Sequence, residues 1–264
     1  MTHVLEVRGL AVEFDGFKAI DGVDFSVEQG ELRFLIGPNG AGKTTLIDCI
    51  TGLTRPTAGD VVFEGKSLNG LAEHRRVKLG IGRSFQTPTV FDTLTVADNL
   101  DLAEAFRSRF PRLFLRRKGV SAGVAATLER VGLADVAERP AGALSHGQKQ
   151  WLEIGMLLVQ EPKLLLLDEP VAGMSPQERL DTGALLHELA GEHTVVVIEH
   201  DMAFLRRFAH TVTVLHEGKI ISEGSVDKVQ SDPIVREVYL GRSRDERSGQ
   251  GKEPAAAGGR RGKS

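Results

Sequence analysis

The sequence predicts an α/β protein in which a helical segment interrupts a sheet of buried parallel strands. Three observations predict this fold class. Short apolar and β-branched runs separated by turn residues occupy both ends of the chain. Residues 71–160 instead carry apolar side chains at the three- and four-residue spacing of helices. The run at 164–167 is apolar at every position, as in a parallel strand that helices cover on both faces.

The composition excludes several classes of protein. The chain has 264 residues, of which 41% are apolar and 26% charged, so it can bury a core of its own. A net charge of -3 argues against a general affinity for nucleic acid. One cysteine, Cys49, excludes a disulfide framework and indicates a reducing compartment. Because no apolar run approaches the roughly 20 residues that span a bilayer, and the first residues lack a signal-peptide layout, we expect any work at a membrane to be done from the cytosol through a partner.

The first part of the chain is predicted to form strands. Alternating or β-branched residues lie at 4–14, 23–27 and 31–37, with Gly and Asp breaks between them. Residues 43–53, KTTLIDCITGL, have helical spacing and a glycine near their end. A further short strand, GDVVFEG, follows at 59–65 between turn glycines.

The middle of the chain is predicted to be helical, and strands return after it. Helical spacing is clearest in three segments, at 94–106, 121–137 and 146–160. Strand-like runs follow at 163–170, 193–200, 211–218 and 219–224. The sequence therefore places a mainly helical segment inside an α/β unit.

Two segments have compositions that do not suit a packed core. Residues 242–264 are rich in Gly, Arg and Ser, so we expect a disordered tail, with a regulatory or lipid-touching tail as the alternative. Residues 107–119 are basic with interleaved Phe and Leu. We interpret them as a solvated loop between helices, and contact with anionic lipid headgroups is the alternative.

The segment 37–44 fits the pattern G-x-x-x-x-G-K-[ST] between a predicted strand and a predicted helix. In such a loop, successive backbone amides and the helix N-terminus surround phosphate oxygens. Lys43 can reach the β- and γ-phosphates, and the Thr44 hydroxyl can bind Mg²⁺. The pattern predicts a nucleotide site but leaves its use open, because kinases, GTPases and ATPases share it.

Two carboxylates, Asp168 and Glu169, end the apolar run at 164–167. Ligands of open α/β sheets bind at the carboxyl ends of the strands, so both side chains should face the phosphates. We expect Asp168 to hold Mg²⁺ and Glu169 to polarise the water that attacks the γ-phosphorus. The alternative is an acidic pair that merely begins a helix.

Three further polar residues allow a structural and a functional interpretation. Gln86 follows a strand-like segment. Ser145 begins an amphipathic helix, where an N-cap is the simpler role. His200 ends a strand-like run; alone it would be structural, but near a phosphate loop it is a candidate contact of the γ-phosphate.

Together these segments resemble the ATP-binding subunits of ABC transporters, from Leu5 to about Gly241. The glycine loop GPNGAGKTT, Gln86, the segment LSHGQ, the run LLLLDE and His200 occur in the family's order and spacing. LSHGQ is the specific element, because other P-loop families lack it. The resemblance implies a P-loop NTPase (RecA-like) core with an N-terminal antiparallel β subdomain. It also implies an inserted α-helical subdomain at about 87–160, within an ABC ATPase domain that spans 1–241.

The resemblance also implies roles for single residues. Phe14 would stack on adenine. Residues that would bind the phosphates are Gly37, Pro38, Asn39, Gly40, Ala41, Gly42, Lys43, Thr44 and Thr45. Mg²⁺ would be held by Thr44, Gln86 and Asp168. The implied catalytic residues are Glu169 as base, His200 at the γ-phosphate and Gln86 at the attacking water.

The LSHGQ segment implies that one chain is not a complete enzyme. In the family, the residues that match Ser145, Gly147 and Gln148 bind the nucleotide of the opposite subunit. Two ATPase subunits, identical or different, would close head-to-tail around two ATP molecules. The implied partners are integral membrane permease subunits and, indirectly, a periplasmic or extracellular substrate-binding protein, with no nucleic acid. The chain would lie peripherally on the cytoplasmic face of a bacterial membrane.

Two residues depart from the family pattern. His146 replaces a glycine of the family's signature, which is the segment LSHGQ in this chain. It lies between Ser145 and Gly147, the two residues that would bind phosphate, so we expect function to survive. Ser175 stands where many relatives have an aspartate that communicates between the two sites. Whether the two ATP sites communicate in this protein is therefore an open question, whereas we expect ATP hydrolysis to be retained.

The resemblance narrows further to one group of importers. AGM after the acidic pair and EHDM around His200 are similar to branched-chain amino acid importers. Longer segments, such as LSHGQKQWLEIGMLL, are similar to urea importer ATPases. We expect an importer ATPase, for urea first and branched-chain amino acids as the alternative. A soluble ABC ATPase acting on ribosomes or DNA is less favoured, because the chain has one set of motifs, no sustained heptads and no basic face.

Overall fold

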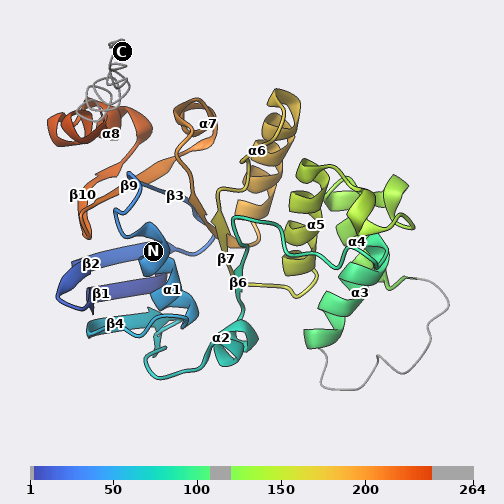
Figure 1. The fold of residues 1–264 in the computed structure, drawn as a ribbon, viewed down its shortest axis with the longest axis horizontal. Helices are drawn as coiled ribbons and strands as arrows, with labels where there is room; N and C mark the ends of the chain where they lie inside the picture. Colours follow the sequence, from blue (N-terminus) through green and yellow to red (C-terminus); the bar gives the residue numbers. More distant parts are fainter. Residues whose placement is uncertain (1–2, 108–119, 240–264) are drawn as a thin grey trace, which may run out of the picture.

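The computed structural model describes residues 3–107 and 120–239 (Figure 1). The predicted tail at 242–264 lies outside the described residues, as does nearly all of the basic stretch at 107–119. No helix in the described part of the chain is both long and apolar enough to cross a membrane.

The N-terminal strands form an antiparallel sheet with the order β2-β1-β4-β5. Its strands are β1 (His3–Phe14), β2 (Phe17–Glu28), β4 (Ala58–Phe63) and β5 (Lys66–Ser67). The predicted antiparallel unit is thus confirmed. β2 is longer than the predicted strand at 23–27, because pairing with β1 keeps its first half extended despite Asp21 and Gly22.

A second sheet has the order β10-β9-β3-β8-β7-β6 and is parallel except for its edge strand β10. Its strands are β3 (Leu32–Ile36), β6 (Ile81–Arg83), β7 (Leu164–Asp168), β8 (Thr194–Ile198), β9 (Thr211–His216) and β10 (Lys219–Gly224). β6 lies inside the stretch that the sequence predicts to be helical. The sequence indicates it only as the strand-like segment before Gln86, because three residues, IGR, are too short to show a strand period.

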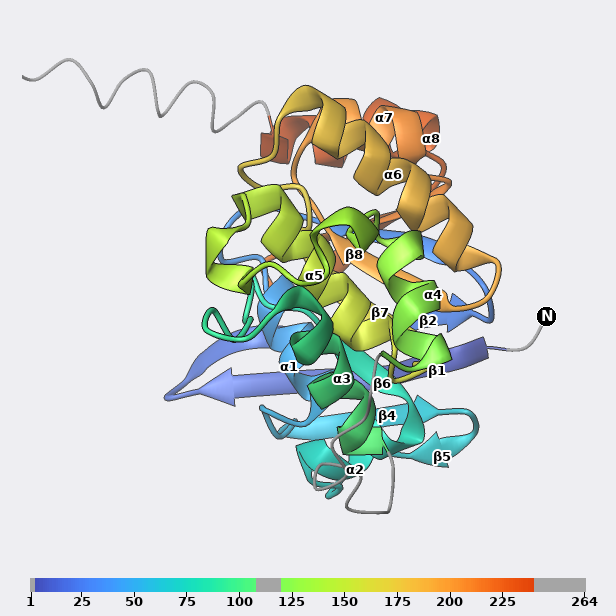
Figure 2. The same ribbon diagram turned by 90° about the vertical axis from the view of Figure 1, so that its right-hand side faces the viewer.

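The helices fall into two groups, on the sheet and in an insertion. Their bounds are α1 (Lys43–Thr51), α2 (Glu73–Leu79), α3 (Val96–Arg107), α4 (Ala122–Arg130), α5 (His146–Leu158), α6 (Pro176–Ala190), α7 (Met202–Phe208) and α8 (Val226–Ser231). α3, α4 and α5 come between β6 and β7 and pack on one another. Figure 2 shows them together on one side of the molecule.

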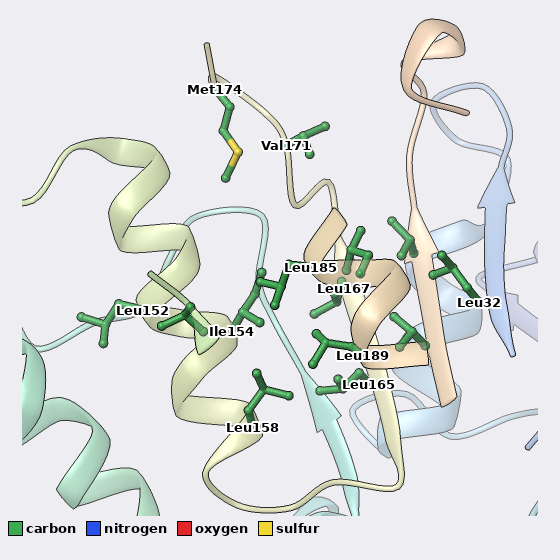
Figure 3. Packing of buried hydrophobic residues seen from close by; sticks show 14 of the residues in the cluster. Leu32, Leu152, Ile154, Leu158, Leu165, Leu167, Val171, Met174, Leu185 and Leu189 are labelled. Atoms are coloured by element: carbon green, nitrogen blue, oxygen red, sulfur yellow. The ribbon is translucent and has the colours of Figure 1, made fainter. Parts of the chain in front are cut away.

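The sheet separates two apolar clusters, as the run at 164–167 predicts. Leu165 and Leu167 of β7 pack in the cluster that contains α5 and α6, which Figure 3 shows. Leu164 and Leu166 point to the opposite face, where the cluster contains α1 and the antiparallel sheet. This alternation buries β7 on both faces and fixes the direction in which its last residue, Asp168, leaves the sheet.

Candidate functional site

The glycine loop joins the end of β3 to the start of α1. A Cβ on Gly37 would lie 2.1 Å from the backbone oxygen of Leu215, and one on Gly42 would lie 2.5 Å from that of Ala19. These two glycines are therefore required by neighbouring strands of the protein itself. Gly40 has open space around it and a φ of +79°, so its backbone conformation is what favours glycine there.

The start of α1 is arranged for an anion. The N-cap, Gly42, offers no side chain to the first amides of the helix, and the described first turn contains no acidic residue. The Lys43 ammonium folds back over the loop, where it donates to the backbone oxygens of Gly37 (2.7 Å) and Pro38 (3.1 Å). A helix start without a capping side chain and a lysine over the same loop are what phosphate binding requires.

The predicted adenine-stacking residue, Phe14, lies where the β1–β2 hairpin turns. Its side chain is 50% exposed, and it pairs in register with Phe17, which is 66% exposed. β2 continues from this turn to Ala19 and Ile20, both of which lie against Gly42 of the glycine loop. The hairpin therefore presents exposed aromatic surface on the strand that borders the loop.

Asp168 ends β7 beside the glycine loop. Its amide donates to the Ser84 hydroxyl at 3.1 Å, which fixes the strand end. Burial raises the pKa of the Asp168 carboxyl. The cations of Arg83 and Lys43 oppose this shift of the Asp168 pKa. The Asp168 carboxylate therefore lies in the electrostatic field of Lys43, the lysine of the glycine loop.

The next residue, Glu169, contacts two other predicted site residues, Gln86 and His200. Its Oε2 accepts from Gln86 Nε2 at 3.0 Å, and its Oε1 lies 3.2 Å from His200 Nδ1. The three side chains come from segments that follow β6, β7 and β8, which are neighbours in the sheet. The Glu169 side chain is 19% exposed, so it is partly shielded while still open to a water molecule. The acidic pair does not begin a helix, since α6 starts only at Pro176.

The sequence did not predict a role for Glu199, the residue before His200. It is 2% exposed, and its carboxylate accepts from the backbone amides of His200 (2.9 Å) and Asp201 (3.1 Å). Burial raises the pKa of the Glu199 carboxyl. Glu199 thus holds the turn that carries His200. Only its place at the end of an apolar run could have suggested this role.

The signature residues lie elsewhere. Ser145 caps α5, accepting from the Gln148 amide at 3.2 Å, and Gln148 Oε1 accepts from the Ser145 amide at 3.1 Å. A Cβ on Gly147 would lie 2.4 Å from Oε1 of Glu178 on α6. In Figure 1, α5 lies on the opposite side of β7 from α1. The structure therefore brings Lys43, Gln86, Asp168, Glu169 and His200 to one edge of the sheet, but not Ser145, Gly147 and Gln148.

The residues present suit a divalent cation beside the loop. Asp168 offers a carboxylate and Thr44 a hydroxyl, which are oxygen ligands of the kind Mg²⁺ prefers. Burial and the carboxylates of Glu169 and Asp48 raise the pKa of the Asp168 carboxyl, and a divalent cation bound there would favour its charged form.

Comparison with known families agrees with this geometry. The family described as "ABC transporter" matches residues 20–172. The family described as "Branched-chain amino acid ATP-binding cassette transporter" matches residues 219–245. Fold and site together thus define an ATP-hydrolysing enzyme of the ABC class. The chain belongs to the ATP-binding subunits of ABC transporters.

Individual relatives narrow the class to importers. BraF of Pseudomonas aeruginosa, a high-affinity branched-chain amino acid transport ATP-binding protein, is 36% identical over 249 residues, which cover 90% of this chain and 98% of BraF. LivG of Escherichia coli has a similar description and is 35% identical over 249 residues, with the same coverage. The solved structure of MJ1267, an ATP-binding cassette of an ABC transporter in its ADP conformation, has a TM-score of 0.80 and 34% identity, and covers 91% of this chain and 100% of that one. This chain is accordingly an importer-type ATP-binding subunit.

Proposed function

We propose that the chain powers an importer by hydrolysing ATP with Glu169 as the base. The observation that carries this proposal is the convergence of Gln86 and His200 on the Glu169 carboxylate. In this proposal Glu169 accepts a proton from the attacking water, Gln86 orients that water, and His200 contacts the γ-phosphate. A carboxylate held by an amide and an imidazole is fixed in orientation before the substrate arrives.

The nucleotide would lie along the glycine loop. Phe14 stacks on the adenine, and Lys43 neutralises the β- and γ-phosphates. The loop residues that surround the phosphates are Gly37, Pro38, Asn39, Gly40, Ala41, Gly42, Thr44 and Thr45. Mg²⁺ would be held by Thr44, Asp168 and Gln86, and it would supply charge neutralisation for the departing diphosphate.

The test of this proposal is Glu169→Gln in the purified protein. The variant keeps the size of the side chain but cannot take a proton, so ATP binding stays near normal while kcat falls about 100-fold or more. Glu188→Gln is the matched control, because Glu188 is an exposed residue of α6 that pairs with Arg130. Near-normal hydrolysis by Glu169→Gln would exclude Glu169 as the base.

We also propose that two ATPase subunits form the complete site. Ser145, Gly147 and Gln148 lie away from the glycine loop of their own chain. They would bind the γ-phosphate of the ATP molecule that the glycine loop of a second subunit holds. The first amides of α5 and the Ser145 hydroxyl are suited to an anion. The second subunit is either another copy of this chain or a related ATPase.

Contact with permease subunits is proposed for the segment at 85–91, on the cytoplasmic face of the membrane. This segment carries Gln86, and it exposes two phenylalanines, Phe85 at 44% and Phe91 at 48%. Exposed aromatic residues on an irregular segment are suited to a protein partner. Motion of the permease would then reach Gln86 directly. A substrate-binding protein outside the cell would complete the importer.

The cargo has two candidates. Urea is favoured by the resemblance of LSHGQKQWLEIGMLL and neighbouring segments to urea importer ATPases. Branched-chain amino acids are favoured by the descriptions of BraF and LivG. Uptake of labelled urea and labelled leucine, measured side by side in cells that carry chromosomal Glu169→Gln, separates them. Loss of urea uptake alone supports the first candidate, and loss of leucine uptake alone supports the second.

A further inference from the structure

The segment at 85–91 has no regular secondary structure, although it positions Gln86. Its start is fixed to the sheet, because the Ser84 amide donates to Leu166 O at 2.9 Å. Beyond Ser84, no backbone oxygen in the described residues is recorded as an acceptor for the amides of this segment. Backbone amides in such a segment need side-chain partners if they are to stay in one place.

Glu153 of α5 supplies those partners. Its Oε1 accepts from the amide of Thr89 at 3.1 Å and from the amide of Phe85 at 3.4 Å. These two amides lie on either side of Gln86 in the sequence. The residue is 5% exposed, and its other oxygen, Oε2, is buried without a hydrogen-bond partner in the described part of the chain.

Asn99 of α3 fixes the far end of the same segment. Its Oδ1 accepts from the Phe91 amide at 2.8 Å, and its Nδ2 donates to the Phe91 oxygen at 3.1 Å. Asn99 is fully buried. The segment is thus attached to the helical insertion at both Glu153 and Asn99, while the Gln86 side chain reaches across to Glu169.

A buried carboxylate is a costly way to hold two amides. Burial raises the pKa of Glu153 to about 7, which shows how strongly this environment disfavours the charged form. An apolar residue would pack here at less cost, but it would leave the amides of Phe85 and Thr89 without their acceptor. The carboxylate is therefore better explained by what it holds than by its contribution to the core.

We propose that Glu153 is a positioning residue for ATP hydrolysis, which holds residues 85–89 so that Gln86 reaches Glu169. The inference rests on the proposed roles of Gln86 and Glu169. Glu153 lies about two turns along the helix that Ser145 caps. A displacement of α5, when Ser145 takes the partner's nucleotide, therefore moves the segment that carries Gln86. In this way Glu153 connects Ser145, which contacts the partner's nucleotide, to Gln86, which acts on the chain's own nucleotide.

Three variants separate positioning from packing. Glu153→Leu removes both acceptors and keeps the volume. Glu153→Gln keeps an acceptor at the position of Oε1 and places its amide nitrogen where Oε2 has no partner. Gln150→Leu is the matched control, because Gln150 is 2% exposed on the same helix and its Nε2 is buried without a hydrogen-bond partner in the described residues.

Hydrogen exchange in the nucleotide-free protein tests the attachment without any assumption about activity. The backbone amides of Phe85 and Thr89 should exchange at least about 10-fold faster in Glu153→Leu than in the wild type, because an amide without its acceptor opens more readily. Glu153→Gln and Gln150→Leu should exchange like the wild type. Unchanged exchange in Glu153→Leu would overturn the inference.

ATP hydrolysis then tests the consequence. Glu153→Leu should lower kcat about 10- to 100-fold at an unchanged KM for ATP, because Gln86 is displaced while the glycine loop is not. Glu153→Gln should restore kcat to within about 2-fold of the wild type. An equal loss in Gln150→Leu, or an unchanged kcat despite faster exchange, would overturn the positioning role. A wild-type protein without ATPase activity would instead contradict the proposed function, and the exchange result would stand by itself.

Discussion

At the scale of single residues, Glu169 combines a strained backbone with a fixed side chain. Its φ is 49°, a left-handed conformation that costs a residue with a Cβ about 1–2 kcal/mol. The neighbouring strand offsets this cost, since the Glu169 amide donates to Ile198 O at 3.0 Å. The turn directs the carboxylate between Gln86 and His200. Strain at this point is consistent with a residue whose orientation matters more than its contribution to stability.

The glycine loop gives a prediction that separates strain from steric clash. Gly40→Ala places a Cβ in open space at a left-handed φ and should cost about 1 kcal/mol of unfolding free energy. Gly42→Ala adds a contact of 2.5 Å with the Ala19 oxygen, so it should cost at least about 2 kcal/mol more. Thermal unfolding without nucleotide measures both. Equal losses in the two variants would show that β2 does not constrain the loop.

Glu153 gives a prediction about pH. Its pKa is about 7 when folded and near 4.5 when unfolded, so its contribution to stability is fully present below pH 4.5 and is lost as pH rises through 7. Between about pH 5 and 7 the wild type should lose about 1.4 kcal/mol per pH unit relative to Glu153→Gln. Denaturant unfolding of both proteins at pH 5, 6, 7 and 8 measures the difference. A difference that does not change with pH would mean that Glu153 stays charged or exposed.

The sequence predicted which side chains meet at the sheet edge better than it predicted the residues that support them. Gln86, Asp168, Glu169 and His200 could be predicted because each follows a recognisable strand in a known order. Glu153 and Glu199 could not, because acidic residues in a helix or at a strand end look like surface residues. Their burial depends on packing between elements that lie far apart in the sequence. A single sequence does not show such packing.

At the scale of elements, the long apolar patterns were predicted and the short or interrupted ones were not. β7 was predicted as a strand buried on both faces, and its residues do alternate between the two apolar clusters. α6 was missed, although Ser175, Pro176 and Glu178 form a helix-start signal of N-cap, first-position proline and capping box. That signal was hidden because Ser175 was interpreted only as a replacement for an aspartate.

The N-cap of α6 gives a prediction at this scale. The Ser175 hydroxyl accepts from the Glu178 amide at 3.3 Å, and the Glu178 carboxylate accepts from the Ser175 amide at 2.8 Å. Ser175→Ala should cost about 1 kcal/mol of unfolding free energy, whereas Ser175→Asp should cost almost nothing, because aspartate also caps helices. Urea unfolding measures both variants. If both lose the same amount, the cap is not what the hydroxyl contributes.

At the scale of the whole molecule, the two proposed kinds of nucleotide contact lie on different elements. The glycine loop and Glu169 lie at the carboxyl ends of the parallel strands, whereas Ser145 and Gly147 lie at the start of α5 in the helical insertion. Glu178 connects the signature to α6, since Gly147 leaves room for its carboxylate. In the proposed arrangement a single chain presents both halves of a site without closing them on one nucleotide, and this separation is the reason to expect a head-to-tail pair.

Specific ATPase activity as a function of protein concentration, with sedimentation of the same samples, tests this central claim most directly. The account predicts that activity per chain rises with concentration as ATP draws two chains together, or appears only when a second ATPase subunit is added. Ser145→Arg should abolish the rise, because a bulky side chain blocks the signature while the glycine loop is intact. Activity per chain that is constant in a species sedimenting as a monomer would contradict the account.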